Sequence, residues 1–95
     1  MAKAVVDGTV VAESQDTVVV EGNHYFPPGS VQWDHFDETD HTTVCGWKGT
    51  ANYYSLKVAD KTLQNVAWTY HDPKDAAEEI KDYVAFYPQV SVTSD

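Results

Sequence analysis

The residues best suited to chemistry lie in one short segment of this chain, Thr42–Ser55. Cys45 and Lys48 stand three residues apart inside it, in a predicted turn that leads into a strand. A nearby ammonium group favours the thiolate, which is the reactive form of a cysteine. The structural alternative, and the more common one, is that Cys45 is a small buried hydrophobe beside a turn lysine. The segment therefore contains a candidate nucleophile whose role depends on its surroundings.

Two neighbours bear on this pair. Gly46 and Gly49 bracket the lysine, and glycine permits close approach by a ligand or by another backbone segment. His41 lies just upstream, and a Cys/His pair could carry out nucleophilic or acid–base chemistry. A loop histidine is more often solvated than catalytic, and no third residue that would orient it can be identified. The candidate catalytic residues are Cys45, Lys48 and His41.

Aromatic residues near this segment could form the wall of a ligand pocket. Tyr53 and Tyr54 point to opposite faces of a predicted strand, so only one of them can face a given pocket. We expect Tyr54 to pack in the core with Trp68 and Tyr70, and Tyr53 to face the pocket. Aromatic walls with hydroxyls and one ammonium suit a small organic ligand. The predicted ligand-binding residues are Thr43, Cys45, Trp47, Lys48 and Tyr53.

The acidic segment 34–41 contains carboxylates and imidazoles that could bind calcium or a transition metal. It lacks the glycine and the glutamate that an EF-hand loop carries at its sixth and twelfth positions. We therefore expect a solvated acidic loop, and we predict no metal site and no cofactor.

Charge restricts the partners of the chain. Fifteen acidic residues stand against six basic ones, all of them lysine, and the net charge is −9. Nucleic-acid binding depends on basic surface that displaces counterions from phosphates. The absence of arginine also removes the bidentate phosphate clamp. We predict neither a nucleic-acid nor a membrane partner, and a monomer is the default expectation.

Length and composition predict one domain, residues 1–95. The chain is 42% hydrophobic and 13% aromatic, which suffices for a core without disulfides. The first residues hold too short an apolar run for a signal peptide. No stretch approaches the roughly 20 apolar residues of a membrane span. We expect a cytoplasmic protein.

Local patterns predict a mainly β fold. Asp7-Gly8 between β-branched residues predicts a tight hairpin over residues 5–11. Further strands are expected at residues 17–20, 31–33, 52–58, 65–70 and 90–92. After Asp72 and Pro73, apolar residues recur at spacings of three and four up to Tyr87 and predict a helix that Pro88 stops.

The chain resembles the domain of unknown function 427 family over about residues 4–92. The resemblance rests on four separated blocks in the family's order: 25–27 (YFP), 43–54 (TVCGWKGTANYY), 67–70 (AWTY) and 83–87 (YVAFY). It implies a compact, mainly antiparallel β-sheet domain of the β-tent or Mss4-like type with one short C-terminal helix. Some β-tent relatives bind zinc through paired CxxC motifs, which this chain lacks. The family is sometimes labelled nucleotidyltransferase-like, but no DxD follows Gly29-Ser30.

Three functions stay open at this point. The first is a binding module with a pocket for a small polar or aromatic ligand near Cys45, Lys48 and Tyr53. The second is an enzyme that uses Cys45 as nucleophile, with Lys48 or His41 assisting, or that has a nucleotidyltransferase-like activity. The third is a structural or protein-interaction domain whose acidic surface meets a basic protein.

Overall fold

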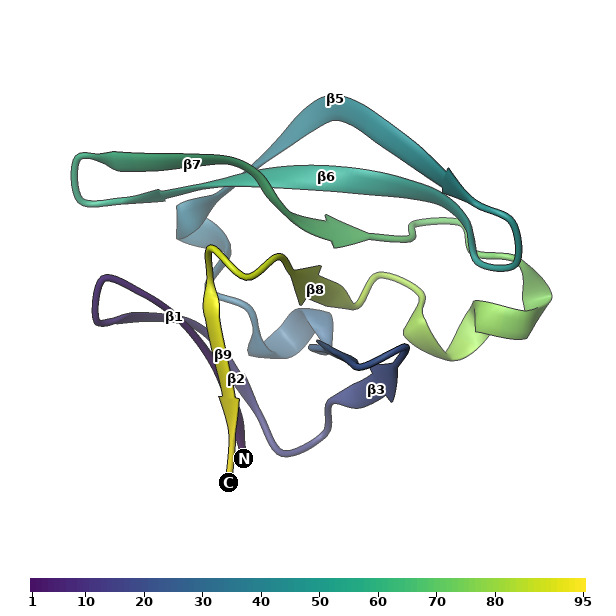
Figure 1. The fold of residues 1–95 in the computed structure, drawn as a ribbon, viewed down its shortest axis with the longest axis horizontal. Coiled ribbons are helices and arrows are strands. Elements are labelled where there is room, and N and C mark those ends of the chain that lie inside the picture. The colour runs from purple at the N-terminus through teal and green to yellow at the C-terminus, as the bar shows by residue number, and fades with distance from the viewer.

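The computed structural model describes all residues, 1–95, and contains three antiparallel sheets (Figure 1). The first has the order β2-β1-β9, with β1 at Ala2–Val6, β2 at Thr9–Ser14 and β9 at Ser91–Ser94. The second pairs β3, Val18–Val20, with β4, Asn23–Tyr25. The third has the order β5-β6-β7-β8, with β5 at Phe36–Cys45, β6 at Gly49–Val58, β7 at Lys61–Thr69 and β8 at Val84–Phe86. The predicted mainly β class is confirmed.

Two hairpins turn on residue pairs in the left-handed conformation. Asp7 (φ 47°) and Gly8 (φ 79°) connect β1 to β2, as the sequence predicts. Glu21 (φ 53°) and Gly22 (φ 81°) connect β3 to β4 in the same way. Such two-residue turns suit the right-handed twist of the strands they connect. The second turn brings Glu21 within reach of Lys48, which lies in the turn between β5 and β6 of the third sheet.

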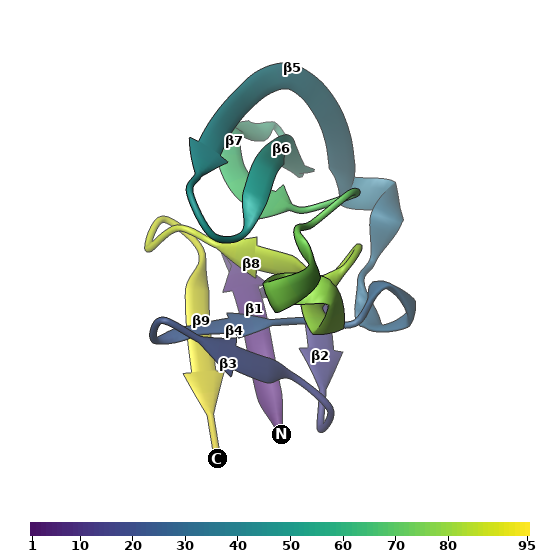
Figure 2. The same ribbon diagram turned by 90° about the vertical axis from the view of Figure 1, so that its right-hand side faces the viewer.

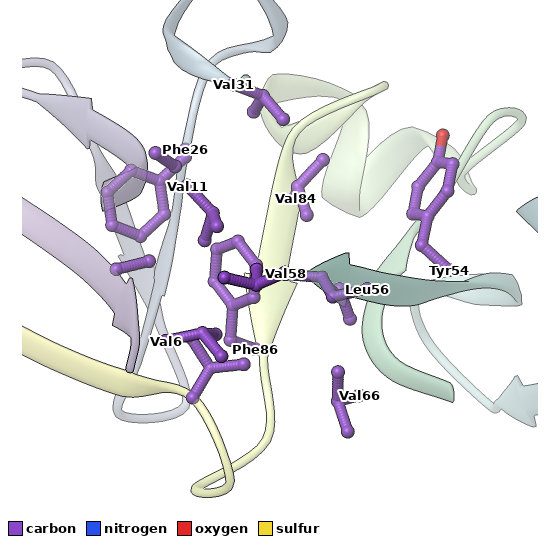
Figure 3. Packing of buried hydrophobic residues seen from close by; sticks show 14 of the residues in the cluster. Val6, Val11, Phe26, Val31, Tyr54, Leu56, Val58, Val66, Val84 and Phe86 are labelled. Atoms are coloured by element: carbon purple, nitrogen blue, oxygen red, sulfur yellow. The ribbon is translucent and has the colours of Figure 1, made fainter. Parts of the chain in front are cut away.

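The third sheet is covered on opposite faces at its two ends. One face of β6 carries Tyr54, Leu56 and Val58, which pack against the first sheet in a core of 15 buried residues (Figure 3). The other face carries Ala51 and Tyr53. These belong to a second core of eight buried residues, whose other members are Tyr25, Trp68, Tyr70, Ala77, Ile80 and Ala85. Past Tyr53 this second face loses its cover, and Lys57 is exposed on it.

The expected placement of the aromatic residues is wrong in two respects: the core that Tyr54 joins, and Tyr53, which is buried and does not line the pocket. Tyr53, and not Tyr54, lies directly opposite Trp68 and shares the second core with Trp68 and Tyr70. Tyr54 belongs to the first core. Alternation along β6 separates the two tyrosines as predicted. The register of β7 against β6 decides which tyrosine lies opposite Trp68. This register cannot be derived from the alternation of residues within one strand.

The predicted acidic loop is instead a short 3-10 turn, η2 (Trp33–His35), followed by the first half of β5. Strand β5 pairs only with β6 and forms an edge of the third sheet. Acidic side chains on an edge strand can reach water while the backbone keeps its ladder. The strand expected at 31–33 is also absent, because the 3-10 turn η1 (Pro28–Ser30) leaves Val31 only an isolated bridge to Ala12.

The predicted C-terminal helix is shorter than its apolar spacing indicates. The segment η3 (Asp75–Ile80) is a 3-10 helix with a non-helical residue at Ala77 (φ −119°). Asp82 (φ 63°) then turns the chain, and Val84–Phe86 forms β8 against β7. Burial of three successive residues between the two cores outweighs the helical spacing. No helix of the protein has the length and apolar character needed to cross a membrane.

Gly49 is a position where backbone conformation and packing both require glycine. Its φ is +112°, and a Cβ there would lie 3.4 Å from the backbone N of Lys74 and 3.5 Å from the backbone O of Asp72. We expect Gly49→Ala to lower the free energy of unfolding by about 1–3 kcal/mol. Urea denaturation followed by tryptophan fluorescence measures the change.

Gly46→Ala is the matched control in the same turn. No atom lies within 4 Å of a Cβ at this position, and its φ is not in the left-handed range. We expect a change within about 0.5 kcal/mol. Equal losses for the two variants would contradict the packing role of Gly49.

Candidate functional site

The segment singled out in the sequence forms the tip of the β5–β6 hairpin. Cys45 pairs with Gly49 across the turn. The segment before η3 holds this tip in place, because the Lys74 amide donates to the carbonyl of Lys48 (2.9 Å) and Lys74 Nζ donates to the carbonyl of Gly46 (2.7 Å). Gly49 therefore serves the close approach of another backbone segment.

Lys48 is buried and is used in packing. Its ammonium forms an ion pair with Glu21 and lies 5.3 Å from the Trp47 ring centroid and 5.7 Å from that of Tyr70. Burial acts to lower the Lys48 pKa, but the hydrogen bond to Glu21 and attraction to the phenol oxygens of Tyr25 and Tyr70 raise it overall. The hydrogen bonds from Lys48 and Trp47 hold the pKa of the Glu21 carboxyl below its usual value. The pair thus ties the second sheet to the third.

Cys45 is a free, partly buried thiol at the base of the same turn. The structure therefore brings Cys45, Lys48 and Trp47 together in one turn, with the ammonium already paired to Glu21.

Tyr53 is the centre of a second group. Its hydroxyl shares hydrogen bonds with Thr43 Oγ1 (2.9 Å) and with the Tyr87 hydroxyl (3.0 Å). The Tyr87 ring stacks on it at a centroid distance of 6.2 Å, and the His41 ring meets it edge-on at 4.6 Å. The hydrogen bond shared with Tyr53, together with burial, raises the pKa of Tyr87 to about 12. Thr43, Tyr53 and His41 are therefore brought together.

The protein has one pocket, and it begins at His41. Its volume is about 540 Å³ and it is open to solvent. Ser55 contributes to it from β6, two residues after Tyr53 and hence on the same face of the strand. The seven lining residues are Thr39, Asp40, His41, Ser55, Thr62, Gln64 and Asn65. Cys45 and Lys48 do not line it.

The pocket exists because both neighbours of β6 bulge at nearly the same level. On one side, residues 39–41 of β5 stand opposite the single residue Tyr53, and β5 bows away as an arch (Figure 2). On the other side, residues 64–66 of β7 stand opposite the single residue Ser55. Bulges re-aim side chains and are common next to active sites. Here they turn two sets of polar side chains toward a common opening.

Hydrogen bonds connect the two bulges over β6. Thr39 Oγ1 donates to Asn65 Oδ1 (2.7 Å), and the backbone amide of Asn65 donates to Ser55 Oγ (3.0 Å). Asn65 adopts a left-handed conformation (φ 52°), which asparagine tolerates better than most residues. The His41 amide donates to Thr39 Oγ1 (3.3 Å). The walls of the pocket are therefore positioned before any ligand arrives.

His71 anchors β5 immediately before its bulge. Its Nε2 lies 3.2 Å from the Glu38 carboxylate, and its Nδ1 lies 2.8 Å from Asp82 Oδ1. Burial acts to lower the His71 pKa, but the hydrogen bonds to the two carboxylates raise it overall. Glu38 is thus held at the point from which the chain departs into residues 39–41.

Comparison with known families identifies the family of this chain. The model of the family described as "Domain of unknown function (DUF427)" matches residues 1–95, the whole chain. The chain belongs to the DUF427 family. No curated protein matches it. The family's description assigns no role to the DUF427 domain.

Sequence reasoning identified only one lining residue of the DUF427 pocket, His41. Ser55 and Asn65 are polar residues inside predicted strands, which is a weak indication of a polar site. The pairing of β6 with both neighbours was needed to show that they meet. Tyr87 was missed as a partner of Tyr53 because its segment was expected to be helical. No group of three or more His, Cys, Asp or Glu side chains could hold a metal ion.

The Glu21–Lys48 pair predicts a pH-dependent stability of the DUF427 domain. We expect Glu21→Gln to lower the urea midpoint at pH 7, because the buried ammonium loses its counter-ion. The folded-state pKa of Glu21 is depressed, so its contribution is present above the unfolded pKa and is lost as pH falls through the folded pKa. The difference between wild type and variant should therefore vanish on acidification.

Glu13→Gln is the control for this prediction. Glu13 pairs with Lys3 at 3.4 Å, and both side chains are about half exposed. Exposed ion pairs contribute little to stability, so the midpoint should scarcely change at pH 7. Indistinguishable midpoints for the two variants at pH 7 would show that burial of Lys48 does not matter.

Proposed function

We propose that this DUF427 domain is a binding module for a small polar ligand, which occupies the pocket between the bulges of β5 and β7. The observation that carries the proposal is the lining. All seven lining side chains are polar, and they come from three neighbouring strands whose pairing is interrupted at this level.

The arrangement of the walls supports a binding role. Each bulge removes ladder hydrogen bonds and is stabilised by side-chain bonds that Thr39, Asn65 and Ser55 supply. Polar groups held in place before binding lose little conformational freedom when a ligand arrives. A volume of about 540 Å³ also lies within the range of about 300–1,000 Å³ typical of small-molecule sites.

The proposed site adjoins the predicted one without coinciding with it. His41 forms a wall of the pocket and packs on Tyr53, which in turn bonds to Thr43. The ligand would therefore contact His41, with the buried Tyr53 ring behind it. Cys45 and Lys48 lie at the hairpin tip and do not line the pocket, so they would not contact the ligand.

A chemical-shift titration of the ¹⁵N-labelled domain with a panel of metabolites tests the proposal. We expect at least one class to shift the amides of residues 39–41, 55 and 62–65 more than those of residues 46–49. Asp40→Asn should weaken that response. Asp37→Asn, on the same exposed strand but outside the pocket, should leave it unchanged. A panel that leaves all pocket amides unmoved would contradict the binding role.

A nucleophilic Cys45 is the second candidate, and the observation that favours it is a free, partly exposed thiol in the same hairpin turn as Lys48. This candidate predicts that iodoacetamide modifies Cys45 faster in the folded domain than in the unfolded chain at pH 7. Glu21→Gln should accelerate the reaction, because the ammonium is then free of its carboxylate partner. Modification only after unfolding, measured by mass spectrometry, would eliminate this role.

A further inference from the structure

We propose that the ligand of the pocket between the bulges is a neutral polyhydroxylated compound the size of one or two sugar rings. This inference rests on the proposed binding function and adds the chemical class of the ligand. Four properties of the lining lead to it: its charge, its lack of apolar surface, its unused hydrogen-bonding groups and its one exposed ring.

Charge argues against anionic ligands. The pocket contains the Asp40 carboxylate and no lysine, in a chain with a net charge of −9. Phosphates, carboxylates and nucleotides need cationic or helix-terminal partners, and none lines the pocket. A single exposed carboxylate also attracts cations only weakly in water. A neutral ligand therefore has the smallest electrostatic cost of binding in this pocket.

The lining offers no apolar surface to an aromatic or aliphatic ligand. No hydrophobic residue is among the seven that form the pocket. The hydrophobic contribution to binding scales with the apolar area removed from water, so such a ligand would gain little here. Affinity must come from hydrogen bonds that replace those of water.

Several hydrogen-bonding groups are left for a ligand. Thr39 donates to Asn65 Oδ1, and Ser55 Oγ accepts from the Asn65 amide. The Asn65 side-chain NH₂ and the side chains of Asp40, Thr62 and Gln64 form no hydrogen bond within the protein. They provide a carboxylate acceptor, amide donors and acceptors, and a hydroxyl, all within one opening. A ligand with adjacent hydroxyl groups, each both donor and acceptor, matches this mixture.

His41 adds a flat exposed surface to this set. Its ring is oriented by the edge contact with Tyr53 at 4.6 Å, and the residue is exposed. The C–H face of a sugar ring could pack against such a ring while its hydroxyls meet the polar side chains. A volume of about 540 Å³ accommodates one or two rings. Because neutral hydrogen bonds contribute modestly against water, we expect a Kd on the order of millimolar.

The test uses three ligands that differ in charge on one hexose frame: glucose, glucuronate and glucosamine. Other neutral hexoses, two disaccharides, inorganic phosphate and adenosine complete the panel, and each is titrated into the ¹⁵N-labelled full chain. We expect at least one neutral sugar to shift the amides of residues 39–41, 55 and 62–65. Glucuronate should bind at least about tenfold more weakly than that neutral sugar.

Two substitutions sharpen the result. Asp40→Asn should weaken binding of the neutral sugar roughly fivefold, because a charged acceptor is replaced by a neutral one. It should also reduce the discrimination against glucuronate. Asp37→Asn, with the same charge change outside the pocket, should alter neither. The ¹⁵N spectra themselves report that each variant is folded.

The outcomes separate this inference from the function beneath it. Pocket amides that respond to glucuronate, glucosamine, phosphate or adenosine but to no neutral sugar would overturn the ligand class and keep the binding role. Sugars that shift only residues elsewhere would also overturn the class. If no compound in the panel shifts the pocket amides, both proposals are overturned.

Discussion

Strand β6 has to bury both of its faces, and it does so against different partners along its length. Tyr54, Leu56 and Val58 pack on the first sheet, whereas Ala51 and Tyr53 pack beneath β4 and η3. Burial of apolar area is the dominant favourable term in folding, so these two cores determine where the neighbouring strands can run. The crossover between them, from Tyr53 to Ser55, is the level at which both β5 and β7 bulge.

The bulges and the pocket follow from this change of partner. A strand that packs against one core and then the other needs a local increase in twist, and extra residues in the neighbouring strands supply it. Val66 is buried in the first core, but the other side chains of these two bulges are polar and line the pocket. Asn65 in its left-handed conformation and the Thr39–Asn65 bond stabilise the irregular region. The same feature that lets two cores share one strand thus creates an opening lined by polar groups.

The cysteine–lysine segment has a different part in the structure. Lys48 carries a buried charge that Glu21 neutralises from another sheet, and Gly49 admits the backbone of residues 72–74. Breaking such a pair leaves an unpartnered charge out of water, which is costly, so the contact fixes how the second sheet meets the third. Lys48 and Gly49, two of the residues that single out this segment in the sequence, are therefore needed to hold the hairpin tip in place.

Local rules were sufficient wherever the interaction is local. Asp7-Gly8 encodes its turn through its own backbone preferences, and alternation correctly placed Tyr53 and Tyr54 on opposite faces of β6. They failed where partners are distant in sequence. Spacings of three and four from Ala76 to Tyr87 predicted a helix, yet Val84–Phe86 is needed as a strand against β7. The acidic run 34–41 reads as a loop until β6 pairs with it.

The sequence by itself therefore determined a mainly β domain, its first hairpin turn at Asp7-Gly8, its acidic character and its membership of a family. Each of these depends on composition or on residues that are close along the chain. Only the tertiary structure decided that Tyr53 meets Trp68, that Lys48 meets Glu21, and that His41 shares a pocket with Ser55 and Asn65. Those contacts depend on strand register and on which core covers which face. Both are set by packing between segments far apart in the sequence, and no local pattern encodes them.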